Sequence, residues 1–159
     1  QRDLLIQPTV KRPPVELGVD AYIPDYYVTD VSTRLSIYER LLEAGEGFDP
    51  DVLLEEFTDR FGEPPQKVKD LVLAVYLRTE ISSMEGEIKR IIGTKSEITI
   101  NLKKPYDVTK KILISDKIHN IEIGNALMRL VNLQDPDNDW RVDIVNLIRI
   151  LKDTILVTA

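Results

Sequence analysis

Apolar residues recur at helical spacing in three consecutive segments of the first half of the chain. The first segment begins near Asp30, a residue type that caps helix N-termini, with Ser32 and Thr33 as alternative caps. It ends before Gly45, because glycine readily follows the last turn of a helix. We predict an amphipathic helix here. Its apolar stripe is Leu35, Tyr38, Leu41 and Leu42.

The second and third segments have clear start and stop signals. Asp49 can cap the second helix, Pro50 suits its first position, and Gly62 can end it. The third helix is predicted to begin at Pro64–Pro65 and to run to about Met84. Because it is apolar on several sides, we expect it to be mostly buried. The predicted stripe of the second helix is Leu53, Leu54, Phe57 and Phe61.

The apolar period changes from helical to alternating after the third helix. Residues 97–102 alternate between apolar and polar types, and residues 88–92 are a plausible partner strand, which predicts a β-hairpin. Residues 106–117 have an ambiguous pattern, for which we favour a short helix. Residues 120–133 predict two short strands around Gly124–Asn125. The alternating apolar residues of the first hairpin are Ile98, Ile100 and Leu102.

A final helix is predicted after residues 135–139, with Asn138 as its N-cap. Strands and helices do not alternate regularly, so the class is α+β. We predict an N-terminal helical layer packed on antiparallel hairpins, with a closing C-terminal helix. The proline-containing residues 1–14 are interpreted as an extended linker and residues 15–159 as one domain. The predicted stripe of the final helix is Ile144, Leu147, Ile148, Leu151 and Ile155.

Composition limits the chemistry that the chain can perform. It has no cysteine, which excludes disulfides and cysteine nucleophiles and favours a cytoplasmic location. Its single histidine, His119, is interpreted as a surface or structural residue, and no glycine-rich phosphate-binding motif occurs. No apolar run approaches the length of a membrane span, so we expect no membrane partner. We expect this segment to be no enzyme and to hold no cofactor or metal; a carboxylate-based hydrolase is the weakest alternative.

The net charge of −6 argues against a nucleic-acid-binding surface, since phosphate contacts need lysine and arginine. An acidic surface suits a basic protein partner or serves solubility. One local exception is a basic patch, which is either a solvated face or a contact for nucleic acid or an acidic partner. Trp140 is interpreted as a core or capping aromatic. The basic patch consists of Lys103, Lys104, Lys110 and Lys111.

The second predicted helix carries carboxylates opposite its apolar stripe. At 100° per residue, Glu55, Glu56 and Asp59 project from the polar side, and Arg60 lies near the edge of the stripe. This arrangement is either a solvated acidic face or a docking site for arginine or lysine of another domain. Carboxylate–guanidinium pairs supply orientation as well as energy.

Residues 17–42 and 53–72 carry an ordered set of motifs: an aromatic-proline entry, an R-L-x-x-Y-x-R helix and E-x-x-D-R-F-G-x-x-P. In these motifs the chain resembles the C-terminal domain of the bacterial transcription-repair coupling factor family (Mfd), over about residues 15–80. The matching positions are Tyr22, Ile23, Pro24, Asp25, Tyr27, Arg34, Leu35, Tyr38, Arg40, Glu56, Asp59, Arg60, Phe61, Gly62 and Pro65.

The resemblance implies a longer parent protein, and the absence of an initial methionine leads us to expect a segment of one. The parent would be an ATP- and Mg-dependent translocase on double-stranded DNA. It would displace stalled RNA polymerase and recruit nucleotide excision repair through UvrA. Residues 1–14 would then be the linker from its motor region.

The resemblance also implies a role for the domain itself. In the family this domain does no chemistry; it packs on the UvrA-recruiting N-terminal domain of the same chain and masks it, which is autoinhibition. We place this interdomain contact on Glu56 and Asp59, with Glu55 and Arg60 beside them. The aromatic-proline segment is interpreted as structural, folding back over the helical layer. We expect the fragment to be a monomer.

Overall fold

The computed structural model describes residues 14–84, 87–106 and 108–158, with side chains described up to residue 153. The α+β prediction is confirmed, whereas the predicted linker at 1–14 lies almost wholly outside the described residues. The elements in chain order are β1 (Val15–Glu16), α2 (Val31–Leu42), α3 (Pro50–Phe61), α4 (Gln66–Ser83), β2 (Ile88–Gly93), β3 (Ile98–Leu102), α5 (Val108–Lys117), β4 (Ile121–Ile123), β5 (Leu127–Leu130) and α6 (Trp140–Thr158).

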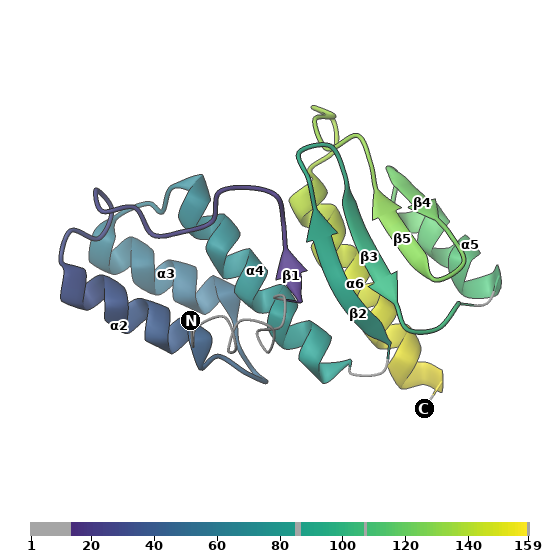
Figure 1. The fold of residues 1–159 in the computed structure, drawn as a ribbon, viewed down its shortest axis with the longest axis horizontal. Coiled ribbons are helices and arrows are strands. Elements are labelled where there is room, and N and C mark those ends of the chain that lie inside the picture. Colours follow the sequence, from purple (N-terminus) through teal and green to yellow (C-terminus); the bar gives the residue numbers. More distant parts are fainter. Residues whose placement is uncertain (1–13, 85–86, 107, 159) are drawn as a thin grey trace, which may run out of the picture.

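Helices α2, α3 and α4 form a layer at one end of the molecule (Figure 1). The predicted stripe of α2 is wrong in part, because Leu35 and Leu42 are 57% and 74% exposed. The helix instead buries Ile37 and Leu41, which are four residues apart and so lie one above the other on one face. Leu35 lies two residues before Ile37, which turns it about 200° away from the buried side.

The predictions for α3 and α4 are confirmed. The Asp49 carboxylate accepts hydrogen bonds from the backbone N–H groups of Asp51 and Val52, and Pro50 occupies the first turn. Helix α4 is buried on two sides. Its N-terminal half contributes Val68 to the core of the helical layer, and its C-terminal half contributes Leu77 to the core beneath the sheet.

Within the residues that the structure describes, the strands form one five-stranded sheet in the order β1-β2-β3-β5-β4. Both predicted hairpins are present and antiparallel, and β3 pairs with β5 to join them. Strand β1 was not predicted: it pairs in parallel with β2, with Val15 opposite Ile91. Figure 1 shows α6 running behind the sheet, and the buried face of the sheet packs into the same core as α4 and α6.

The start of α6 differs from the prediction. Asp139, rather than Asn138, sits directly before the helix, and its carboxylate accepts a hydrogen bond of 3.0 Å from the backbone N–H of Arg141. Its backbone carbonyl also accepts from the N–H of Asp143 at 3.1 Å. The side-chain amide of Asn138 donates to the Asp143 carboxylate instead. The residue that caps α6 is therefore Asp139, one position after the predicted Asn138.

The helices of the second half otherwise follow the prediction. Residues 108–117 are helical, as favoured, and Trp140 is a buried core residue. The described part of the predicted α6 stripe is buried, whereas the side chain of Ile155 lies outside the described residues. Within the described ranges, no helix combines the length and apolar content needed to cross a membrane. The buried stripe residues are Ile144, Leu147, Ile148 and Leu151.

Candidate interdomain docking site

The aromatic-proline segment closes one edge of the helical layer, which confirms its structural interpretation. The Tyr27 hydroxyl donates to the backbone carbonyls of Gly62 at 2.7 Å and Phe57 at 3.2 Å. The Tyr27 ring meets the Phe61 ring edge-on, with centroids 5.7 Å apart. These contacts fix the end of α3, because one tyrosine can combine apolar burial with hydrogen bonds at its tip.

The other two tyrosines of this segment are more exposed. The Tyr22 hydroxyl accepts a hydrogen bond of 3.2 Å from the ammonium group of Lys67. Tyr26 is 67% exposed. The structural role of the segment therefore rests on Tyr27 and on Ile23, which is buried and donates its backbone N–H to the Tyr38 hydroxyl at 2.8 Å.

Helix α3 presents Glu55 and Asp59 on its outer side, and both are exposed. In the part of the chain that the structure describes, neither carboxylate takes part in an ion pair. They lie four residues apart and therefore on the same helix face. With Glu63 and Asp51 they border a shallow acidic depression on the α4 side of the helix, where the Lys69 ammonium pairs with Glu63 at 2.8 Å.

Glu56 differs from its neighbours because it is used inside the domain. Its carboxylate receives two hydrogen bonds from Arg40 of α2, at 2.6 and 2.7 Å, and a third contact from Arg60 at 3.2 Å. Arg60 also stacks on Phe61, with its guanidinium carbon 4.7 Å from the ring centroid. Glu56 and Arg60 thus join α3 to α2, and Glu55 and Asp59 remain the carboxylates directed outward.

The Arg40 hydrogen bonds, assisted by Arg60, lower the pKa of Glu56 from 4.5 to about 2. A depressed carboxyl pKa stabilises the fold above the unfolded-state value, and this contribution disappears as the pH falls from about 4.5 to about 2. Since the arginine side chains are about half exposed, we expect the contribution to be under about 1 kcal/mol.

The measurement is urea unfolding of wild type and Glu56→Gln at pH 6 and at pH 2. The difference in unfolding free energy should be present at pH 6 and close to zero at pH 2. Glu39→Gln, on the exposed side of α2, is the control and should show no such change. A difference between wild type and Glu56→Gln that stays constant across this pH range would contradict the assigned ion-pair network.

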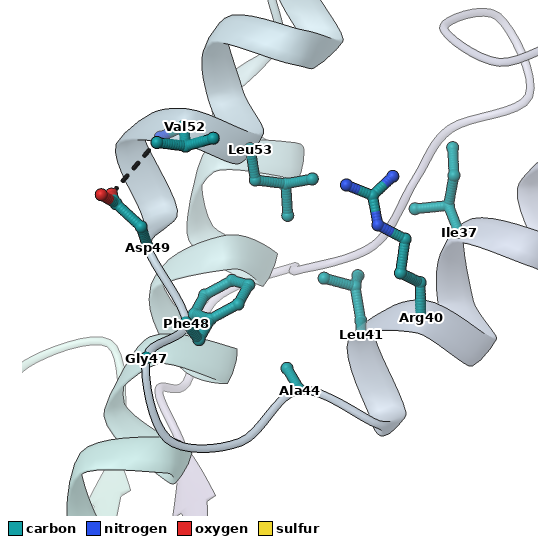
Figure 2. Close-up of a pocket in the computed structure, with 9 residues that line it drawn as sticks. All are labelled: Ile37, Arg40, Leu41, Ala44, Gly47, Phe48, Asp49, Val52 and Leu53. Atoms are coloured by element: carbon teal, nitrogen blue, oxygen red, sulfur yellow. Dashed lines mark hydrogen bonds between the residues drawn. The ribbon is translucent and has the colours of Figure 1, made fainter.

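A small apolar pocket lies on the other flank of α3, where it meets the end of α2 (Figure 2). Its volume is about 350 Å³. Its two ionisable residues are both engaged: Arg40 pairs with Glu56, and Asp49 caps α3. Figure 2 shows the apolar side chains converging on the same space. They are Ile37, Leu41, Ala44, Phe48, Val52 and Leu53.

A second charged cluster links the helical layer to α6 and was not predicted. The Asp70 side chain is 3% exposed and accepts two hydrogen bonds from Arg141, at 2.6 and 2.9 Å. The Gln66 amide donates a third at 2.8 Å. The sequence does show a charged residue, Asp70, within the otherwise buried stretch of α4. It could not show the partner of Asp70, because Arg141 lies 71 residues away in the sequence.

The basic patch does not gather into one exposed cluster. Lys103 and Lys104 are exposed before α5, whereas Lys111 is half-buried and the Lys110 ammonium lies 5.5 Å from the centroid of the Tyr106 ring. His119 is exposed. Among the described residues, no group of three histidine or acidic side chains is arranged to hold a metal ion.

The architecture defines a class of domain that is already known from a solved structure. That structure is a crystal structure of the C-terminal domain of transcription-repair coupling factor. The two share a TM-score of 0.63 and 24% sequence identity, and the alignment covers 89% of this chain and 95% of that one. This comparison establishes the fold.

The sequence then establishes the family. The model of the TRCF domain family matches residues 17–113, and the chain belongs to that family. Two similar relatives are transcription-repair-coupling factors. That of Haemophilus influenzae is 40% identical over 70 residues, covering 44% of this chain and 6% of the relative. That of Myxococcus xanthus is 36% identical over 98 residues, covering 62% of this chain and 8% of the relative. The chain thus spans less than a tenth of their length.

Proposed function

We propose that this domain is the non-catalytic regulatory module of an ATP-driven DNA translocase that displaces stalled RNA polymerase and couples transcription to nucleotide excision repair. In this role it packs on the UvrA-recruiting domain of the same parent chain and keeps that surface masked. The observation that carries the proposal is the outer face of α3. There Glu55 and Asp59 point outward beside an apolar pocket, on a domain of a transcription-repair coupling family.

The energies suit a reversible contact. An exposed carboxylate–guanidinium pair contributes about 0.2–1 kcal/mol, so a few such pairs hold weakly. Two domains of one chain are present at high effective concentration, and weak contacts suffice to keep them together. Binding of RNA polymerase or DNA to other domains of the parent protein can therefore release such a contact. We assign the contact to Glu55 and Asp59 rather than to Glu56 and Asp59, the pair predicted from the sequence, because Glu56 is bound by Arg40 and Arg60 inside the domain. Reversing its charge would also break those contacts.

The test is UvrA binding by the full-length parent protein, with the double substitution Glu55→Lys/Asp59→Lys. We expect UvrA to bind the variant about tenfold more tightly than wild type, because the reversed charges repel the basic partner surface. The difference should shrink as salt is added. Asp116→Lys/Asp153→Lys is the matched control, since it makes the same change of charge at exposed positions of α5 and α6. Equal UvrA affinity in wild type and the Glu55/Asp59 variant would refute this assignment of the docking face.

A further inference from the structure

The pocket between α2 and α3 adjoins the outer face of α3 at Val52. Val52 forms part of the pocket wall, is 61% exposed, and precedes Glu55 and Asp59 by three and seven residues. Residues at these spacings share one helix face. A surface that covers the two carboxylates would therefore also reach Val52, at the edge of the pocket.

The pocket is preformed and apolar. Three of the side chains that line the pocket are each no more than 5% exposed: Ile37, Leu41 and Leu53. Ala44 and the Phe48 ring form the wall of the pocket on the side of the 43–49 loop (Figure 2). Arg40 adds no free charge to the wall because Glu56 binds both of its terminal nitrogens, at 2.6 and 2.7 Å. A polar or charged side chain entering this space would lose its water without gaining a partner, whereas an apolar one would only gain contacts.

We propose that this pocket receives one aliphatic or aromatic side chain from the basic surface on which α3 docks; this rests on the proposed function. The occupant is thus defined by its chemistry. It carries an apolar anchor residue for the pocket and an arginine or lysine for Glu55 or Asp59. At 1.5 Å per residue the two recognition points lie about 5–10 Å apart along α3, which is the spacing required of the partner.

The apolar anchor and the charged pairs contribute differently to such a contact. The charged pairs steer the approach and weaken with salt, whereas burial of an apolar side chain in a preformed pocket is largely independent of salt. Central buried anchors surrounded by weaker polar contacts are the usual source of binding energy in small interfaces. A substitution that fills the pocket should therefore expose the UvrA-binding surface even at salt concentrations where the acidic face contributes little to the interdomain contact.

The experiment measures UvrA binding by the full-length parent protein at low and moderate salt. Ala44→Leu places a larger side chain in the pocket and should tighten UvrA binding about tenfold at both salt concentrations. Val52→Ser removes part of the wall at an exposed position, so it keeps the fold and should act in the same direction. Ser36→Leu adds the same bulk at an exposed site of α2 outside the pocket and should leave UvrA binding unchanged.

The Glu55→Lys/Asp59→Lys variant is measured alongside, which separates the two proposals. If it unmasks UvrA binding while Ala44→Leu and Val52→Ser behave as wild type, the pocket is empty in the docked state and the inference is wrong, although the proposed function stands. If none of the three variants changes UvrA binding, the docking face that the proposed function assigns to α3 is wrong, and the anchor fails with it. Unmasking by both pocket variants, with Ser36→Leu unchanged, supports the anchor.

Discussion

Arg141→Met is expected to lower the free energy of unfolding by about 3 kcal/mol, because it leaves the Asp70 carboxylate buried and without a cationic partner. Asp70 would lose the hydrogen bonds of 2.6 and 2.9 Å from Arg141 and keep only that from Gln66. The expected loss of stability lies at the lower end of the usual cost of breaking a buried ion pair, since the Arg141 side chain is itself 31% exposed. Chemical denaturation of the two proteins measures the difference.

The matched control is Arg149→Met, which removes an exposed arginine from the same helix. It should change the free energy of unfolding by no more than about 0.5 kcal/mol. The double variant Asp70→Leu/Arg141→Met removes both charges and should recover much of the lost stability. If Arg141→Met cost no more than Arg149→Met, the pair would not hold α4 to α6.

Gly93→Ala is also expected to lower the free energy of unfolding by about 3 kcal/mol, in this case for a steric reason. An added Cβ at Gly93 would lie 2.3 Å from the backbone oxygen and 2.5 Å from the carbonyl carbon of Leu17. Because both atoms belong to the backbone, no change of side-chain rotamer relieves the overlap, and the chain beyond β1 would have to move away from β2. Gly45→Ala is the control: nothing lies within 4 Å of its added Cβ, and stability should change little.

A second pair of glycines separates crowding from backbone conformation in the same denaturation experiment. Gly18 and Gly47 have similar positive φ angles of 76° and 87°, and alanine is strained at both. An added Cβ at Gly18 would lie 2.7 Å from backbone atoms of Gly93, whereas Gly47 has open space around it. Gly18→Ala should therefore destabilise the domain clearly more than Gly47→Ala. Equal effects would mean that the approach of residues 17–18 to β2 is not tight.

The sequence predicted those features that depend on neighbours along the chain. Helix α3 is the clearest case, because the Asp49 cap, the Pro50 start and the Phe57 stripe are all local signals. For α2 the helical spacing of the apolar residues was compatible with more than one buried face. Contact with the other helices, rather than the period, selected Ile37 over Leu35 as the buried residue.

The features that were missed depend on contacts between distant residues. Strand β1 has two residues, too few for an alternating pattern to be visible, and it exists because β2 offers a parallel edge. The sequence placed Glu56 on the polar side of α3 but could not show that Arg40 would bind it from α2. Consequently the outward carboxylates of the candidate site, Glu55 and Asp59, could be distinguished from Glu56 only in three dimensions.

The most direct test of the proposed masking role is site-specific photo-crosslinking in the full-length parent protein. A photoreactive amino acid in place of Thr58, which is exposed and lines the same depression as Glu55 and Asp59, leaves both carboxylates in place. It should crosslink to the UvrA-recruiting domain of the same chain, as mapped by mass spectrometry. The same substitution at Asp116 on α5 should not. The crosslink should decrease when the parent is bound to UvrA. Crosslinks from position 58 to other regions only, or none in excess of those from position 116, would contradict the proposed docking face.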